Sequence, residues 1–205
     1  RSMLIGCLMS KNTSSLYRCV ANHNQFRVFA TDTTDVVQKA RDIHDLSPIS
    51  TILIGRMITA AALMSGELKA PGAELSLRIL GNGVLKGGMA LANKEGDLRA
   101  YSYNPKLILT NPTDNFLVGK HIGSGHLTVM RQSGLKKPYT GMTELVSGEV
   151  AEDLAEYYLK SEQLPTAINL GVLIDKDATI RSAGGIMIQQ IDRKSTRLNS
   201  SHRIR

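Results

Sequence analysis

Cysteine is scarce in this sequence. Cys7 and Cys19 are its two cysteines among 205 residues, and eleven residues separate them. Neither lies in a Cys-x-x-Cys pair or in a cluster with histidine, so the pattern indicates neither a zinc site nor a disulfide framework. We therefore expect reduced thiols and a cytoplasmic location.

Proline is also scarce, and no hydrophobic run reaches the length of a typical bilayer span. Six prolines and 18 glycines exclude a collagen-like or proline-rich chain. The longest apolar stretch, residues 49–64, is about a turn short of a membrane helix and carries Arg56 at its centre. The apolar residues 3–9 are followed by polar KNTSS and are not typical of an export signal. With 42% hydrophobic and 21% charged residues, the composition predicts a soluble globular domain with a substantial core.

The excess of positive charge is concentrated at the C-terminus. The formal net charge is +7, but residues 192–205 hold five basic residues and one acidic residue, which leaves +3 for residues 1–191. So small an excess gives little support to nucleic-acid binding. Residues 192–202 (DRKSTRLNSSH) resemble a translated sequencing adapter, so we expect residues 192–205 to be a non-native tail. A basic, disordered C-terminus is the alternative.

The hydrophobic periodicity predicts an α+β fold. Residues 35–44 have the spacing of an amphipathic helix, and Ser47-Pro48 starts a second helix that is apolar on nearly all sides. A helix of this kind must be covered on most sides by other elements. Layered antiparallel β-sheets enclosing this mostly buried helix, in a single domain, are the predicted architecture. Strands are predicted at residues 25–32, 74–79, 89–91, 98–103, 126–132, 139–146, 167–174 and 179–190, a further helix at residues 149–161, and helix caps at Thr33 or Thr34 and at Ser147.

Two glycine-rich segments resemble nucleotide-binding loops only superficially. In residues 81–88 (GNGVLKGG), Lys86 does not precede a serine or threonine at a helix start, as a phosphate-binding loop requires. Residues 119–126 (GKHIGSGH) do not lead from a strand into a helix, as a dinucleotide-binding loop would. We interpret the first segment as a hairpin turn with a bulge and the second as a loop.

The remaining polar residues do not form a recognisable active site or metal site. His121, His126, Glu149 and Asp153 have no metal-ligand spacing, so solvated or hydrogen-bonded loop histidines are expected. Glu149, Glu152 and Asp153 are interpreted as the solvated first turn of a helix. Ser147 lacks the Gly-x-Ser-x-Gly frame of a catalytic serine. We therefore predict no catalytic, cofactor-binding or metal-binding residue in this chain.

Five blocks of sequence carry a family resemblance. The blocks are residues 31–37 (TDTTDVV), 55–64 (GRMITAAALM), 145–154 (LVSGEVAEDL), 161–167 (SEQLPTA) and 183–189 (AGGIMIQ). In their order and spacing they closely resemble the N-terminal domain of the 33 kDa heat-shock chaperonin family, the redox-regulated holdases of bacteria. The resemblance extends over residues 26–190.

The resemblance implies a stress-response chaperone that is not an enzyme. Its members bind unfolded or oxidatively damaged client proteins without ATP, prevent their aggregation and form homodimers, with no specific nucleic acid and no membrane as partners. It also implies a client-binding and dimerisation domain at residues 25–191, which leaves a variable N-terminal extension (1–24) before it and the adapter-like, non-native tail (192–205) after it. Full-length members bind one zinc through four C-terminal cysteines, which form disulfides on oxidation. This chain has none of the four, so no cofactor is expected in it, and no role passes to Cys7 or Cys19.

The sequence leaves two alternative functions open, and also the environment of Arg56. The chain could be a small-molecule enzyme with its site on the loops at residues 81–88 and 119–126, or a polyanion-binding module that depends on its basic tail. Arg56, the single charge within the apolar helix, is expected either to have a carboxylate or carbonyl partner or to reach the surface.

Overall fold

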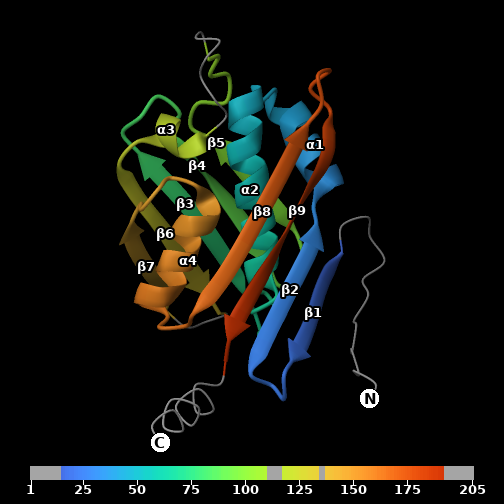
Figure 1. Ribbon diagram of the computed structural model, residues 1–205, viewed down its shortest axis with the longest axis vertical. Coiled ribbons are helices and arrows are strands. Elements are labelled where there is room, and N and C mark those ends of the chain that lie inside the picture. The colour runs from blue at the N-terminus through green and yellow to red at the C-terminus, as the bar shows by residue number, and fades with distance from the viewer. Residues whose placement is uncertain (1–14, 110–116, 134–136, 192–205) are drawn as a thin grey trace, which may run out of the picture.

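The computed structural model describes residues 15–109, 117–133 and 137–191 (Figure 1). The predicted tail, Cys7 and most of the predicted N-terminal extension lie outside these residues. Within the described ranges the elements are β1 (Leu16–Ala21), β2 (Phe26–Asp32), α1 (Thr34–His44), α2 (Pro48–Ser65), β3 (Glu74–Gly81), β4 (Gly87–Asn93), β5 (Leu98–Ser102), α3 (Val118–Ile122), β6 (Gly125–Gln132), β7 (Tyr139–Glu144), α4 (Val150–Ser161), β8 (Thr166–Ile174) and β9 (Ile180–Gln190).

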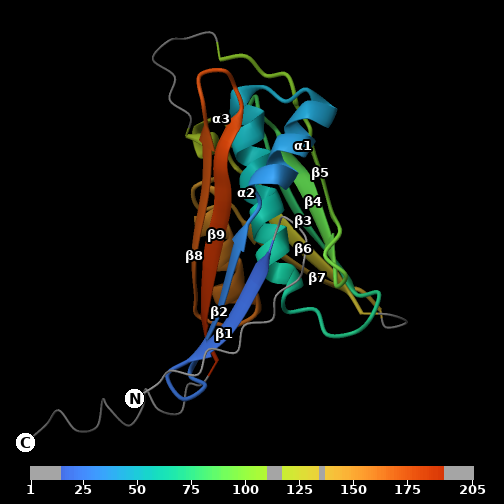
Figure 2. The same cartoon turned by 90° about the vertical axis from the view of Figure 1, so that its right-hand side faces the viewer.

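Two antiparallel sheets enclose α2. The four-stranded sheet has the strand order β1-β2-β9-β8, and the five-stranded sheet has the order β5-β4-β3-β6-β7. Helix α2 packs against strands of both sheets, and α4 packs against β7 and β8. Figure 2 shows the two sheets on opposite sides of α2. The predicted α+β architecture, with layered sheets around a buried helix, is confirmed.

Helix α2 is the centre of the core because its residues are apolar or small on every side. Proline at its first position has the φ angle of a helix and has no amide that would lack a partner there. All residues of α2 except Pro48 and Arg56 are buried. A Cβ atom at Gly55 would lie 2.7 Å from the Val172 side chain, so glycine lets β8 approach the helix closely. By length and composition alone α2 could cross a membrane, but 83% of this stretch is buried inside the protein.

The period-two segments form the strands that their alternation predicts. Leu75, Leu77 and Ile79 of β3 are buried against the core, while Glu74 and Arg78 are exposed. Strands β3, β4 and β5 form the expected meander, and residues 81–88 connect β3 to β4 as a hairpin. Strands β8 and β9 form the second expected hairpin, with a register shift at Leu173 and Ile174.

Two elements differ from the prediction. Strand β1 lies within residues 1–24, so the four-stranded sheet begins ahead of the expected domain boundary at residue 25. The prediction missed β1 because its six residues mix exposed and half-buried side chains without a clear alternation. The segment 119–126 is not simply a loop, since its first half belongs to the short helix α3 and its second half starts β6.

The helix caps also differ from the prediction. Thr33 precedes α1, but its hydroxyl is buried against that of Thr59 (2.7 Å), and the carboxylate of Asp32 accepts the hydrogen bond from the Thr34 amide (2.9 Å). Helix α4 starts after Glu149, and the Ser147 hydroxyl accepts a hydrogen bond only from the Glu149 amide (3.1 Å). The N-cap residue is Thr33 in α1 and Glu149 in α4, and neither side chain forms a capping hydrogen bond.

Candidate functional site

The four-stranded sheet has one face that no described helix covers. Successive side chains of a strand point to opposite faces, and Phe29 and Met187 are completely buried on the face toward the helices. Their neighbours in sequence therefore point away from the core, on the face of the sheet that is turned toward the viewer in Figure 1. The strand register aligns these side chains in cross-strand rows, which we call the outer face: Tyr17, Cys19 and Ala21 of β1, Phe26, Val28 and Ala30 of β2, Ile186, Ile188 and Gln190 of β9, and Ala167 and Asn169 of β8.

The outer face is apolar and partly exposed. The side chains of these rows are uncharged, and only Gln190 and Asn169 carry an amide; the next row on this side of the sheet holds the exposed carboxylate of Asp32, beside Gly184. Tyr17 is 41% exposed and Ile186 is 39% exposed, while Val28, Ala30 and Ile188 are half-buried. A contiguous apolar surface of this kind is typical of a site that binds other apolar groups.

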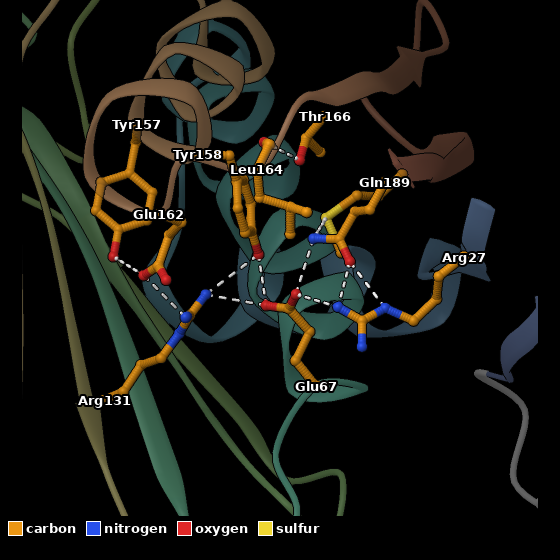
Figure 3. Close-up of polar contacts among 10 residues, drawn as sticks. Arg27, Glu67, Arg131, Tyr157, Tyr158, Glu162, Leu164, Thr166 and Gln189 are labelled. Atoms are coloured by element: carbon orange, nitrogen blue, oxygen red, sulfur yellow. Dashed lines mark hydrogen bonds and ion pairs between the residues drawn. The ribbon is translucent and has the colours of Figure 1, made fainter. Parts of the chain in front are cut away.

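Behind this sheet, a polar cluster joins both sheets at the C-terminal end of α2. Glu67 follows Gly66, the C-cap residue of the helix, and its carboxylate accepts four hydrogen bonds (Figure 3). Oε1 accepts from Arg27 Nη2 (3.2 Å) and Gln189 Nε2 (2.8 Å). Oε2 accepts from Arg131 Nη2 (2.9 Å) and the Tyr158 hydroxyl (2.6 Å). One carboxylate therefore binds β2 and β9 of one sheet, β6 of the other sheet, and α4.

The rest of the cluster balances its charge. Arg131 Nη1 donates to Glu162 Oε1 (3.0 Å), which also accepts a hydrogen bond from the Tyr157 hydroxyl (2.8 Å). Two arginines and two glutamates give no net charge, and burial raises the pKa of Tyr157 and Tyr158, so both hydroxyls remain protonated donors. With its acceptors saturated and its charges paired, this cluster holds the sheets together; we assign it no chemistry.

A cleft opens beside β1, on the core side of the four-stranded sheet. Its volume is about 630 Å³. Leu16 and Thr31 line it from the sheet, Val36 and Lys39 from α1, and the β4–β5 turn at residues 94–97 lines the opposite side. The walls mix apolar groups, hydroxyls and both signs of charge, so the cleft favours no single small molecule.

Arg56 has the carboxylate partner that was expected for a buried charge. Its Nη1 donates to Glu149 Oε2, and both side chains are 23% exposed. Glu149 Oε1 accepts a second hydrogen bond, from the Gly119 amide (2.9 Å). This pair connects the middle of α2 to the starts of α3 and α4.

The predicted solvated helix start is wrong for two of its three residues. Glu149 is paired with Arg56, and Asp153 is completely buried. Asp153 Oδ1 accepts hydrogen bonds from the amides of Val146 (2.7 Å) and Ser147 (3.1 Å), and burial raises the pKa of this carboxyl. Because the loop before α4 folds back over the helix, residues in its first turn become part of the core.

The two histidines do not come together. His121 is buried in α3 and His126 is exposed in β6. No group of three or more His, Cys, Asp or Glu side chains that could hold a metal ion occurs in the described parts of the chain. That this chain has no metal site remains a prediction.

The two glycine-rich segments do come together, but their backbones pack directly against each other. The Leu85 amide donates to the His121 carbonyl (2.9 Å), and the Gly83 amide donates to the Ile122 carbonyl (2.7 Å). A Cβ atom at Gly83 would lie 2.3 Å from the His121 carbonyl oxygen. At this contact no space remains for a substrate, so the structure disfavours the loop-borne enzyme site.

Neither the outer face nor the Glu67 cluster was predicted from the sequence. A signal for the outer face was present, because Ile186, Met187 and Ile188 are consecutive apolar residues in a strand and must lie on both faces of the sheet. No comparable signal marks Glu67, whose partners lie 40 to 122 residues away along the chain.

Comparisons with known proteins agree on one family. A family model described as Hsp33 protein matches residues 14–204. The 33 kDa chaperonin of Desulforamulus reducens is 43% identical over 175 residues, which cover 85% of this chain and 59% of that protein. The 33 kDa chaperonin of Clostridium perfringens (strain SM101) is 42% identical over 180 residues, covering 86% of this chain and 57% of that protein.

A solved structure agrees with the sequence relatives. The crystal structure of the 33 kDa chaperonin (heat shock protein 33 homolog) from Thermotoga maritima matches with a TM-score of 0.82 and 38% identity, covering 90% of this chain and 64% of that chain. This chain thus spans less than two thirds of the length of each of these relatives. The family match includes residues 192–204, and the non-native origin of residues 192–205 remains a prediction.

Proposed function

Because this chain belongs to the Hsp33 protein family, we propose that it is a molecular chaperone of the holdase type. It binds exposed apolar segments of unfolded or oxidatively damaged proteins without ATP and keeps these clients from aggregating. Homodimer formation, a cytoplasmic location, and the lack of a specific nucleic-acid or membrane partner are parts of the same proposal. The similarity to proteins named 33 kDa chaperonin supports a chaperone and argues against an enzyme.

The outer face is the observation that carries this proposal. A holdase must accept many different sequences, so its surface should select for apolar character rather than for particular side chains. The outer face meets this requirement, since it is uncharged, contiguous over four strands and fixed from behind by α2. A client segment that covers Val28, Ile186 and their neighbours gains free energy by removing apolar surface from water.

Zinc does not fit the residues of this chain. A structural zinc site requires four ligands, usually cysteine and histidine. Cys19 is half-buried on the outer face, Cys7 lies outside the described residues, and no metal-binding group is found in the described ranges. We therefore propose a holdase activity of this chain that does not involve zinc and is equal under reducing and oxidising conditions.

Light scattering of a heat-unfolded client, in the absence of ATP, tests the proposal. Wild-type chain should suppress aggregation to the same extent with reductant and with oxidant. Ile186→Lys places a charge in the middle of the outer face and should raise the concentration needed for half-suppression about tenfold, because about 1.4 kcal/mol of binding free energy corresponds to that factor.

Met142→Lys is the matched control. Met142 is 63% exposed on β7, in the other sheet, so the same charge is added away from the outer face. This variant should suppress aggregation like wild type. A folded wild-type chain that does not suppress aggregation would refute the holdase, and equal losses in both variants would refute the outer face as its site.

A further inference from the structure

The free edge of β1 has backbone groups without partners in the described residues. All six residues of β1 pair with β2, and β1 is the terminal strand of its sheet. In an antiparallel ladder alternate residues direct their amide and carbonyl toward the neighbouring strand, and the others direct them away. The groups that point away from β2 have no backbone hydrogen bond to another described residue. They can bind one further strand.

Strand β1 is also the least covered of the four edge strands. Helix α4 packs against the edge strands β7 and β8, and α1 and α2 pack against β5, whereas β1 has no comparable contact with a described helix. Figure 1 shows β1 at the right-hand edge of the four-stranded sheet.

Two of the usual protections of an exposed edge, proline and a bulge, are absent from β1. Proteins discourage further strand pairing with proline, with bulges or with charged side chains. Strand β1 (LYRCVA) has no proline and a regular register, and its single charge, Arg18, lies over the ring of Phe29 (5.8 Å) on the core side of the sheet. The outward side chains of this strand are therefore uncharged.

The space beside this edge suits the side chains of an added strand. Alternate side chains would extend the outer-face rows beyond Tyr17 and Cys19. The other side chains would point toward the cleft of about 630 Å³, which begins at Leu16. Its walls carry Lys39 and Lys94 as well as Glu95 and Asp97, so polar side chains of either charge find a partner there.

We propose that the free edge of β1 binds an extended segment of an unfolded polypeptide as a fifth strand of the four-stranded sheet. Backbone hydrogen bonds hold the segment without regard to its sequence, and its alternate apolar side chains bury surface against the outer face. This inference rests on the proposed holdase function and adds how the client is held. A heterogeneous client fits better than a second copy of this chain, because the cleft walls are not selective for one side-chain pattern.

Amide hydrogen exchange measured by NMR tests the proposal directly. The probe is reduced, carboxymethylated α-lactalbumin, a polypeptide that stays unfolded. In the free chain, amides of β1 that point toward β2 should exchange slowly, and the alternate amides should exchange fast. With the probe at saturation, the alternate amides should exchange at least about tenfold more slowly, as expected for newly formed hydrogen bonds.

Two proline variants add a binding test. Consecutive residues of a strand direct their amides to opposite edges, so of Cys19 and Val20 one amide points to the free edge and the other to β2. The exchange rates of the free chain identify which amide is at the free edge, and proline at that position removes it. That variant should keep the wild-type thermal midpoint and bind the probe about tenfold more weakly. The other variant should lower the midpoint, because it removes an amide that β2 binds. Val20→Thr keeps the amide and should behave like wild type.

The outcomes separate this inference from the holdase function. If the wild-type chain binds the probe but the β1 amides keep their exchange rates, or if the free-edge proline variant binds normally, strand addition is wrong and the holdase stands. If wild type does not bind the probe, both are wrong. If the free-edge amides become protected with rising protein concentration and no probe, the edge belongs to a second copy and the proposal is overturned.

Discussion

Replacing Glu67 with glutamine tests whether the Glu67 cluster holds the two sheets together. Glutamine has nearly the same size but only one accepting oxygen. Some of the four groups that donate to Glu67 must therefore lose their partner; they belong to Arg27, Gln189, Arg131 and Tyr158. Both guanidinium groups also lose the negative charge that they share.

The expected loss can be bounded from the structure. Removing one partner of a buried ion pair costs about 3–5 kcal/mol. The side chains of Glu67, Arg27 and Arg131 are 12%, 18% and 21% exposed, so solvent screens part of the interaction. We therefore expect the free energy of unfolding to fall by about 3 kcal/mol, near the lower bound. In a domain of this size, such a loss lowers the thermal midpoint by about 6–12 °C.

Urea unfolding followed by circular dichroism at pH 7 measures this free energy of unfolding. The matched control is Glu156→Gln, since Glu156 forms an exposed helical pair with Lys160 and should contribute about 0.5 kcal/mol or less. A quadruple variant, Arg27→Met and Arg131→Met with Glu67→Leu and Glu162→Leu, should recover part of the loss, because it removes all four charges of the cluster and leaves none unpaired. A Glu67→Gln variant as stable as Glu156→Gln would refute the reasoning, and so would a quadruple variant less stable than the single one.

Three further predictions concern one residue each in α2, α3 and α4. Gly119→Ala should destabilise the fold by about 3 kcal/mol or more, because the added Cβ would meet the Ser147 carbonyl oxygen. The control is Gly171→Ala, where the added Cβ has open space. In the same urea titration, its free energy of unfolding should stay within about 0.5 kcal/mol of wild type. Arg56→Met should cost about 1–2 kcal/mol, since Glu149 keeps only its hydrogen bond from Gly119, and a variant as stable as wild type would show that the ion pair contributes nothing. Burial raises the pKa of Asp153 above its unfolded value, so the stabilisation by this carboxyl is complete below about pH 3.8 and is lost as the pH rises through the folded pKa. The Asp153→Asn variant should therefore gain stability relative to wild type as the pH rises. Unfolding midpoints measured from pH 3 to 8 that show the opposite trend would contradict this prediction.

The fold was predictable where the pattern is local. The alternation of residues 74–79 and the apolar character of residues 49–64 each identify an element and its environment, because burial on one face or on all faces leaves a periodic record in neighbouring residues. The carboxylate partner of Arg56 was expected for the same kind of reason, since an enclosed charge needs a counter-charge.

The site was not predictable because its contacts are non-local. Glu67 follows Gly66 at the end of a helix, where a solvated carboxylate is the ordinary expectation, and it becomes buried only because Arg27, Gln189, Arg131 and Tyr158 reach it from four other elements. Strand β1 is a strand only through its pairing with β2. Its sequence has no clear period because neither face is fully buried: Arg18 and Val20 on the core side are exposed, and Cys19 on the outer face is half-buried.

The alternation of the strands also separates binding from stability in this fold. Ile186 and Met187 are adjacent in β9, yet Ile186 lies on the outer face and Met187 is fully buried against the helices. Under the proposed function, a client would contact side chains of the outer face, while α2 and the Glu67 cluster fix the same strands from behind. The sheet can bind apolar surface without loosening its own packing, because the residues that bind and the residues that fold the chain are different members of one alternating sequence. For this reason a loss of binding in Ile186→Lys, with an unchanged unfolding midpoint, reports on the outer face rather than on the fold.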